Sequence, residues 1–191
     1  MPRSFALFGL GLFLLGAAVP ARAQDKKTIA IPGVDRKIAA DTKELDLRST
    51  KVTDAGLKAL TALENLTVLS LYGTKVTDAG MKELAAIKSL TALDLTLTKV
   101  TDAGIKELAP LTSLTSLRLI GTEVSDAGVK DLAALKNLTS LSLNRTKVTD
   151  AGLKELAALK NLTALSLIFT DVTNPGVKEL QKALPKCKIT K

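Results

Sequence analysis

A 24-residue repeat constrains this sequence more than any other feature. The segment TKVTDAGLKALTALENLTVLSLYG begins at Thr50, and related segments follow it every 24 residues. Five full repeats and a shortened sixth begin at Thr50, Thr74, Thr98, Thr122, Thr146 and Thr170. A fixed period of about 20 to 50 residues is typical of a solenoid, in which each repeat is one coil of a stack. One such coil cannot enclose its own leucines, so neighbouring coils must supply the missing walls of the core.

Each repeat predicts one strand and one short helix. In residues 68–72 two leucines alternate with other side chains, which is the period of a strand with one buried face. Leu57, Leu60 and Leu63 are three residues apart, so we expect them to face the same core from the helical side. The strand leucines predict six parallel strands, and residues 186–190 could add a seventh. These leucines form the pairs 45/47, 69/71, 93/95, 117/119, 141/143 and 165/167.

Two further residues recur at the start of each expected helix. Asp54 directly precedes the helical segment of the first repeat, where we expect its carboxylate to cap free N–H groups and to favour the positive end of the helix. Gly56 follows two residues later. Because glycine inside a helix costs about 1 kcal/mol, we interpret it as space for the close approach of the next coil.

The N-terminal residues predict a secretory signal peptide. Arg3 precedes an uncharged apolar run at residues 5–19, and Ala21 and Ala23 form a small-residue cleavage site. An uncleaved membrane anchor is the alternative, but the run is short for a span of about 20 residues. We therefore expect an exported chain, periplasmic or secreted, without stable membrane insertion after cleavage. Its expected parts are the signal peptide 1–23, an N-terminal cap with the first strand 24–49, five repeats 50–169, and a partial repeat with the C-terminal cap 170–191.

A family resemblance rests on residues 66–84 and 138–156, which share the hallmark Thr-x-Val-Thr-Asp-x-Gly. These segments resemble the leucine-rich repeats of the ribonuclease-inhibitor-like (RNI-like) and F-box-associated subclass, and in particular its bacterial exported members. The resemblance covers residues from about 42 to 189. It implies an α/β solenoid with a parallel sheet on the concave side and short helices on the convex side. The Thr that opens each repeat stands where many such repeats carry Asn, and its hydroxyl can make shorter turn hydrogen bonds.

The composition argues against catalysis and against a metal or cofactor site. The chain has no His, which removes the commonest general base and the commonest metal ligand. Asp46 and Asp94 share a column of the expected sheet but lie two strands, about 10 Å, apart, which exceeds the separations given for paired glycosidase carboxylates. The single Cys187 has no disulfide partner in the chain, so we expect it to be a small apolar filler near the C-terminal edge. We therefore expect no enzymatic activity.

The charge pattern argues against a nucleic-acid partner. Residues 50–169 carry a net charge of only +2. A lysine recurs on the expected helix side of each coil, but in five of the six coils an acidic residue follows it directly. Interleaved signs are typical of a solvated face rather than of a track for phosphates. This lysine row comprises Lys58, Lys82, Lys106, Lys130, Lys154 and Lys178.

The repeats differ most at the two positions that follow each strand. Segments 122–145 and 146–169 are identical at 17 of 24 positions, and two of their radical changes fall there. We expect both positions, and the residue between the strand leucines, to face the concave side and to bind another protein outside the cytoplasm. Tyr and Arg are favoured at energetic hot spots, and exposed apolar side chains mark interaction surfaces. The predicted partner-binding residues are Tyr72, Asp94, Leu97, Arg118, Ile120, Asn144, Arg145, Ile168 and Phe169.

Two alternatives to this hypothesis stay open. The concave positions could vary only because the core does not constrain them, with Phe169 shielding the C-terminal end and Asp94 paired with Arg118 at the surface. The chain could instead be a structural or envelope-associated module without a dedicated protein ligand, binding a polymer through the lysine row. In either case we expect a monomer.

Overall fold

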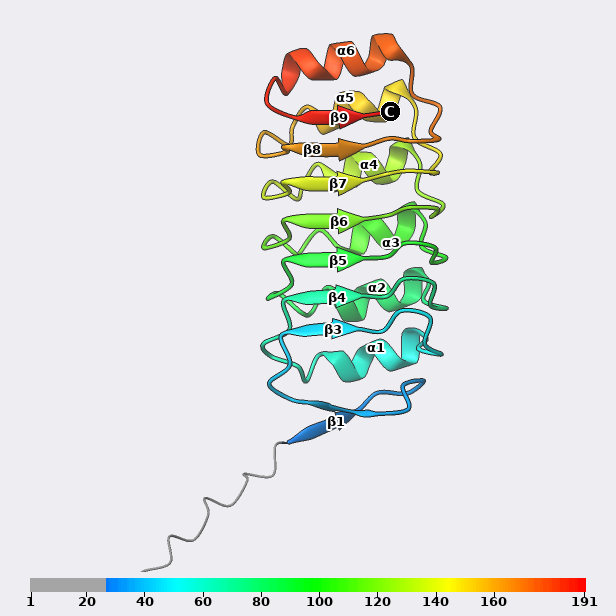
Figure 1. Ribbon diagram of the computed structural model, residues 1–191, viewed down its shortest axis with the longest axis vertical. Helices are drawn as coiled ribbons and strands as arrows, with labels where there is room; N and C mark the ends of the chain where they lie inside the picture. Colours follow the sequence, from blue (N-terminus) through cyan, green and yellow to red (C-terminus); the bar gives the residue numbers. More distant parts are fainter. Residues whose placement is uncertain (1–26) are drawn as a thin grey trace, which may run out of the picture.

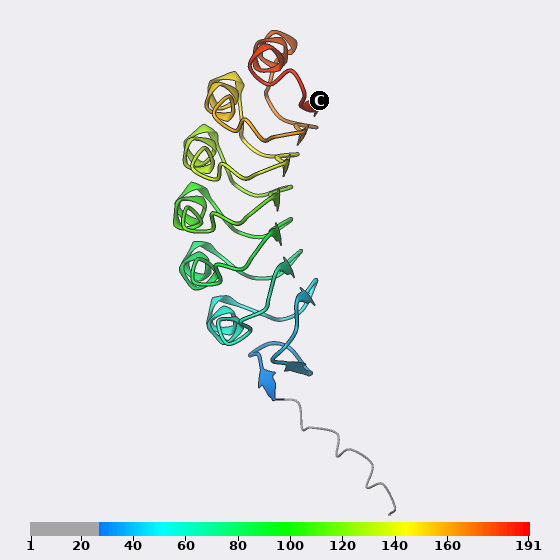
Figure 2. The same cartoon turned by 90° about the vertical axis from the view of Figure 1, so that its left-hand side faces the viewer.

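The described part of the chain is a curved stack of coils. The computed structural model describes residues 27–191, so the predicted signal peptide lies outside the described residues. Strands line one side of the stack and helices line the other (Figure 1). The stack bends so that the strand side is concave and the helix side is convex (Figure 2). This arrangement confirms the α/β solenoid predicted from the repeat.

Seven strands form one parallel sheet in chain order. They are β3 (Glu44–Asp46), β4 (Val68–Ser70), β5 (Ala92–Asp94), β6 (Ser116–Arg118), β7 (Ser140–Ser142), β8 (Ala164–Ser166) and β9 (Lys188–Thr190). The register places the same position of each coil side by side, as in the pairing of Leu45 with Leu69 and of Leu69 with Leu93. The six strands predicted from the leucine pairs are confirmed, and the seventh is formed by Lys188–Thr190.

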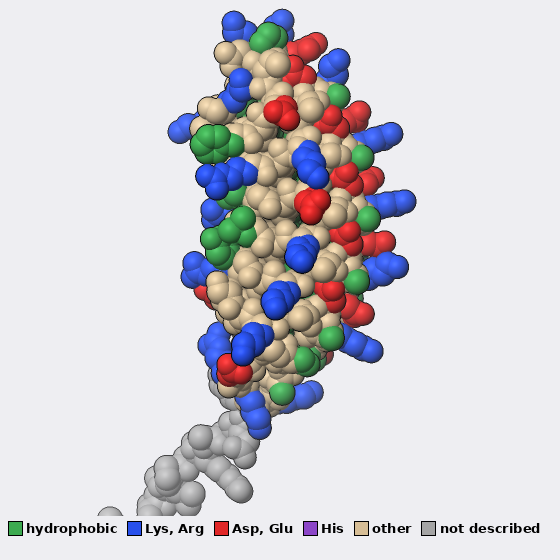
Figure 3. Space-filling view, turned by 90° about the vertical axis from the view of Figure 1, so that its right-hand side faces the viewer, with side chains coloured by type: hydrophobic (Ala, Val, Ile, Leu, Met, Phe, Trp, Pro, Cys, Tyr) green, Lys and Arg blue, Asp and Glu red, His purple; other side chains and the backbone are tan. Residues whose placement is uncertain are grey.

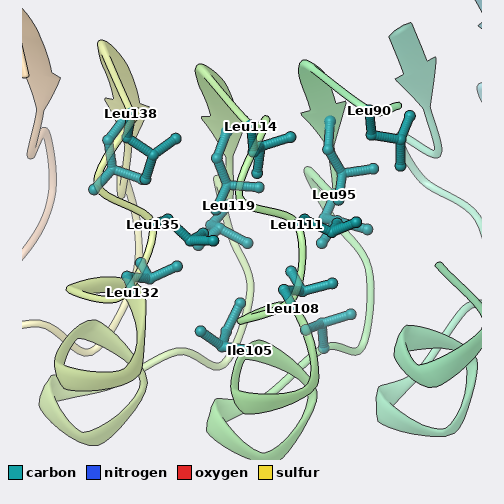
Figure 4. Close-up of a cluster of buried hydrophobic side chains, with 14 of the residues drawn as sticks. Leu90, Leu95, Ile105, Leu108, Leu111, Leu114, Leu119, Leu132, Leu135 and Leu138 are labelled. Atoms are coloured by element: carbon teal, nitrogen blue, oxygen red, sulfur yellow. The ribbon is translucent and has the colours of Figure 1, made fainter. Parts of the chain in front are cut away.

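Short helices cover the convex side. They are α1 (Asp54–Leu60), α2 (Asp78–Leu84), α3 (Asp102–Glu107), α4 (Asp126–Leu132), α5 (Asp150–Leu156) and the longer α6 (Asn174–Ala183). Leu57, Leu60 and Leu63 are completely buried, as their spacing predicts. Leucines from helix, strand and connecting loops of neighbouring coils interleave in the core (Figure 4). Since each buried Leu contributes about 1.5–3 kcal/mol, stacking is the main source of stability. No helix within residues 27–191 has the length and apolar character needed to cross a membrane.

Different caps close the two ends of the core. At the N-terminal end, β1 (Thr28–Ala30) and β2 (Lys37–Ala39) form an antiparallel pair that buries Ile31 and Ile38. At the C-terminal end, α6 and β9 bury Leu180, Leu184 and Cys187. Cys187 lies buried in the hydrophobic core, which confirms its predicted role as an apolar filler, and this burial raises the pKa of its thiol.

The Thr that opens each repeat makes the expected turn hydrogen bond. In the second repeat the Thr74 hydroxyl donates to the carbonyl oxygen of Leu71 at 2.7 Å. The other coils repeat this bond, and the donors are Thr50, Thr98, Thr122, Thr146 and Thr170. The bond satisfies a carbonyl where the chain turns away from the sheet.

The Asp that begins each of the helices α1 to α5 does not cap its own helix, so the capping part of the prediction is wrong. Each of these Asp residues does lie in the first turn, near the positive end of its helix, as predicted. In α2 to α6 the side chain that caps the helix belongs to the Thr or Ser directly before the helix, which is extended: the Thr77 hydroxyl, for example, accepts from the Ala79 N–H. Asp54 turns instead toward the next coil, where Oδ1 accepts from the Thr77 N–H and Oδ2 accepts from the Thr77 hydroxyl, both at 2.8 Å. We call this arrangement the Asp–Thr clamp. It joins Asp54 to Thr77, Asp78 to Thr101, Asp102 to Ser125, Asp126 to Thr149 and Asp150 to Thr173.

The helix glycine makes room for the Asp–Thr clamp. A Cβ built at Gly80 would stand 2.5 Å from Oδ1 of Asp54 and 2.6 Å from a methyl carbon of Leu57. The corresponding glycines of α3 to α6 face the Asp of the preceding coil in the same way. The glycine thus permits close approach between coils, as predicted, but the approaching group is a carboxylate of the preceding coil and not part of the next coil.

Candidate protein-binding face

The concave side of the sheet carries the predicted binding residues in adjacent columns. The residue between the strand leucines forms one column, in which Asp94 on β5 lies beside Arg118 on β6. The position directly after the second leucine of each strand pair forms a second column, which contains Tyr72, Ile120, Asn144 and Ile168. The structure therefore brings these predicted residues onto one face, although they come from different repeats.

The next position forms a column of left-handed turns that sequence reasoning missed. Leu97, Arg145 and Phe169 have φ angles of 55°, 54° and 58°. Ser49 shares this conformation, and Gly73 and Gly121 occupy it in the coils between. Left-handed backbone is uncommon for a bulky residue and costs about 1–2 kcal/mol. The signal in the sequence is the glycine that occupies this position in two of the coils.

Apolar side chains stand out along this edge. The exposed fractions of these residues are 37% for Tyr72, 51% for Leu97 and 75% for Phe169. Figure 3 looks onto the edge at which the strands end, and hydrophobic side chains project at its concave margin. The exposure of Phe169 contradicts the alternative that it shields the C-terminal end of the core.

Two pairs of side chains order the face locally. The Arg145 guanidinium lies over the Phe169 ring, 5.2 Å from its centroid, which is the geometry of a cation–π contact. The predicted surface ion pair is also present, with Arg118 Nε 3.9 Å from Asp94 Oδ2. Exposed pairs of this kind contribute about 0–1 kcal/mol, so neither pair is needed to hold the coils together.

A tighter ion pair at the N-terminal end was not predicted. Arg48 Nη2 lies 2.6 Å from Asp46 Oδ2, and Arg48 Nε donates to the same carboxylate at 2.8 Å. These bonds from Arg48 hold the pKa of Asp46 below its ordinary value of 3.8. The available signal was the spacing of two residues between Asp46, at the end of β3, and Arg48, because in extended chain this spacing places both side chains on the same face.

Asn144 is held by the next coil. Its side-chain Oδ1 accepts from the Ser166 hydroxyl at 2.7 Å and from the Ile168 N–H at 2.8 Å. Both bonds use the oxygen, so they fix the orientation of the amide. The Nδ2 group of Asn144 donates to no other described residue.

Two shallow grooves run along the concave face. The N-terminal groove, of about 480 Å³, lies over β3 to β6 and is lined by Glu44, Asp46, Arg48, Ser70, Asp94 and Arg118, among others. The C-terminal groove has a similar volume of about 480 Å³ and lies over β6 to β9. Ser116 and Arg118 line both grooves. The face is therefore continuous, with Arg118 near its centre.

The part of the chain that the structure describes contains no candidate metal site. Within residues 27–191 no group of three or more His, Cys, Asp or Glu side chains could hold a metal ion. The hydroxyls of Ser70 and Thr96 are buried without a hydrogen-bond partner among the described residues. The described face thus offers ion pairs, hydroxyls and apolar side chains.

The sequence profile of the family described as "Leucine Rich repeat" matches residues 43–60, 62–85, 86–109, 111–133 and 134–157. No curated protein matches the sequence of the chain.

Solved structures share the fold. Internalin C2 of Listeria monocytogenes is 25% identical with a TM-score of 0.58, and the match covers 80% of this chain and 74% of that one. An internalin F of the same organism is 25% identical with a TM-score of 0.57, covering 79% and 48%. A leucine-rich repeat protein of Leptospira interrogans is 28% identical with a TM-score of 0.63, covering 80% and 38%. The chain therefore spans about half or less of the latter two proteins.

Proposed function

Because the chain belongs to the leucine-rich repeat family, we propose that it is a non-catalytic scaffold that binds another protein through its concave face. Leucine-rich repeat scaffolds typically mediate protein interactions. The proposed contact residues are those predicted from the sequence: Tyr72, Asp94, Leu97, Arg118, Ile120, Asn144, Arg145, Ile168 and Phe169.

One observation supports this proposal most strongly. The large hydrophobic side chains that are exposed in the described chain are Tyr72, Leu97 and Phe169, and all three lie at the concave edge of the sheet. Apolar side chains gathered on one face, beside Arg and Tyr, are the composition expected of an interface. The left-handed backbone of Leu97 and Phe169 adds to the argument, because bulky residues are strained there without any gain to the core.

We also propose that the chain is of the RNI-like and F-box-associated type and that it acts outside the cytoplasm. The 24-residue period and the Thr-x-Val-Thr-Asp-x-Gly hallmark support the subclass. The apolar run at residues 5–19 and the small residues before Gln24 support export and cleavage. Mass spectrometry of the secreted chain checks this: cleavage after Ala23 gives an N-terminus at Gln24, and an intact N-terminus in the membrane fraction contradicts it.

The binding proposal is tested with the triple variant Tyr72→Ala, Leu97→Ala, Phe169→Ala. The immobilised wild-type residues 24–191 should capture a distinct protein from extracellular extract, and the triple variant should lose it. Thermal unfolding of the variant should change little, because these side chains lie outside the core. The matched control neutralises Lys82, Lys106 and Lys130 on the convex side. Capture that survives the triple variant but is lost in the lysine control would contradict the proposal and favour a polymer-binding module.

A further inference from the structure

The two grooves of the concave face differ in charge. The N-terminal groove contains the carboxylates of Glu44, Asp46 and Asp94 together with Arg48 and Arg118. The C-terminal groove contains Arg118 and Lys188 and is lined by no carboxylate side chain. Arg118 is well exposed, with 59% of its side chain accessible, and its carboxylate partner Asp94 is 3.9 Å away. Arg118 is therefore paired with Asp94 yet accessible, and Lys188 is exposed, so an anion from outside can reach both cations.

Hydroxyl groups fill the space between these two cations. Four hydroxyls line the C-terminal groove without a side-chain hydrogen bond to another described residue, and all four belong to residues that are exposed or half-exposed. They belong to Ser116, Ser140, Ser142 and Thr190. A hydroxyl rotates to suit its partner, so beside an anion each of them can act as a donor.

Asn144 adds a donor whose direction is fixed. Its Oδ1 already accepts from Ser166 and Ile168, so the amide cannot flip without losing both bonds. Its Nδ2 group is therefore the part left for a ligand in the groove that Asn144 lines. Every charged or fixed polar side chain that remains free in this groove is a hydrogen-bond donor.

We propose that the C-terminal groove, over β6 to β9, binds an acidic segment of the protein partner. This inference rests on the proposed function, because it names the chemistry of the partner at the same face. Carboxylates match a groove that offers donors and positive charge. A protein segment fits better than a small free anion because the groove is shallow and is lined in part by the apolar side chain of Ile120.

Strand spacing sets the pattern of the acidic segment. Arg118 on β6 and Lys188 on β9 lie three strand spacings apart across the sheet, about 14 Å at 4.8 Å per strand. The register places Lys188 in line with Ser116, two residues before Arg118, so the two Cα atoms are about 16 Å apart, a distance that the long Arg and Lys side chains can shorten. In an extended segment that crosses the strands, side chains four residues apart are separated by about 13 Å. Carboxylates at positions i and i+4 would therefore reach the two cations, and a carboxylate at i+2 would lie over the Ser and Asn donors.

The probe is a fluorescent dodecapeptide of alternating Glu and Ser, and binding is measured by anisotropy. We expect saturable binding to residues 24–191 and none for the peptide in which Gln replaces Glu. Arg118→Gln with Lys188→Gln should weaken binding at least about tenfold. The matched control Lys106→Gln with Lys130→Gln removes the same charge from the convex side and should change affinity less than about twofold.

Asn144→Asp provides a second test. The variant keeps an oxygen that can accept from Ser166 and Ile168, but it replaces the free NH2 donor with negative charge. The affinity for the Glu peptide should therefore fall at least about fivefold, while the melting temperature should stay close to that of the wild type. Two results would overturn the inference. One is that the convex control Lys106→Gln with Lys130→Gln weakens peptide binding as much as the groove variants do, and the other is that the chain binds inorganic polyphosphate but not the Glu peptide.

The two proposals fail in distinguishable ways. If the Tyr72, Leu97 and Phe169 variant loses its partner but the Glu peptide does not bind, the concave scaffold stands and the acidic partner is wrong. The opposite result is that the Glu peptide binds with the expected dependence on Arg118 and Lys188, but the triple variant still captures the partner. The acidic-segment proposal is then supported, and the proposed contact through Tyr72, Leu97 and Phe169 is wrong.

Discussion

Along the convex edge, each of the five coil junctions uses the same Asp–Thr clamp, whereas along the concave edge each coil presents a different pair of side chains. At the clamp, a carboxylate, a hydroxyl and a glycine must all fit between adjacent coils. At the concave edge, most side chains at these two positions are exposed or half-exposed, and residues of very different size occupy them from coil to coil. The difference shows that contact between coils, rather than burial alone, keeps a position uniform within this stack.

The first coil supports this explanation. Thr53 precedes α1, has no Asp-bearing coil before it and makes no side-chain capping bond. A Cβ at Gly56 would approach the Pro32 carbonyl oxygen of the N-terminal cap at 2.6 Å rather than a carboxylate. The glycine is thus kept by close packing even where the clamp is missing.

The largest expected effect is at the helix glycine. In Gly104→Val, the new Cβ would collide with the Asp78 carboxylate and lie 2.9 Å from Met81 Cγ. We expect the free energy of unfolding to fall by about 3 kcal/mol, measured by urea denaturation. The matched control is Ala103→Val on the exposed side of the same helix, which should cost about 0.5 kcal/mol. Equal losses in the two variants would mean that propensity, not the neighbouring coil, sets the cost.

Removal of a clamp carboxylate should have a smaller effect. Asp78→Ala leaves the N–H and hydroxyl of Thr101 without their acceptor, and we expect a loss of about 2 kcal/mol. The same change frees the space that a Cβ at Gly104 would need. Gly104→Ala should therefore cost less in the Asp78→Ala background than in the wild type, and a double-mutant cycle checks this. Additive losses would contradict the steric coupling.

Acid should weaken the last clamp. Hydrogen bonds from the Thr173 hydroxyl and backbone hold the pKa of Asp150 below its ordinary value of 3.8. A lowered folded-state pKa stabilises the protein above about pH 4, and this contribution is lost as the pH falls through the folded-state value. Asp150→Asn should therefore make stability less dependent on pH below about 4, as measured by thermal unfolding across that range. An unchanged pH profile would show that this clamp does not depend on ionisation.

The smallest effect is expected at the concave edge. Phe169→Gly relieves a left-handed backbone, a gain of about 1 kcal/mol, but glycine also costs about 0.5–1 kcal/mol of chain entropy. We expect unfolding free energy to change by less than about 0.5 kcal/mol in urea denaturation. A large loss would assign Phe169 a structural role and remove the contrast between the two edges.

The candidate face was predictable in position but not in detail. Comparison of repeats located Tyr72, Arg118 and Phe169 correctly on the concave side, because stacked coils place equivalent residues in columns. The contact between Arg145 and Phe169 and the anchoring of Asn144 by the next coil depend on side-chain directions at turns. The direction of a side chain at a turn follows from the backbone angles, which cannot be read from the amino-acid sequence.

The repeat by itself determined the number of coils, the parallel sheet, the buried leucines and the turn bond of Thr74. These features follow from periodicity, which a linear sequence displays directly. Only the tertiary structure decided that Asp54 bonds to Thr77 of the next coil, that Leu97 and Phe169 lie in left-handed turns, and that one groove offers donors without carboxylates. The physical reason is that these features depend on the spacing and rotation between coils, which arise only when the coils are packed together.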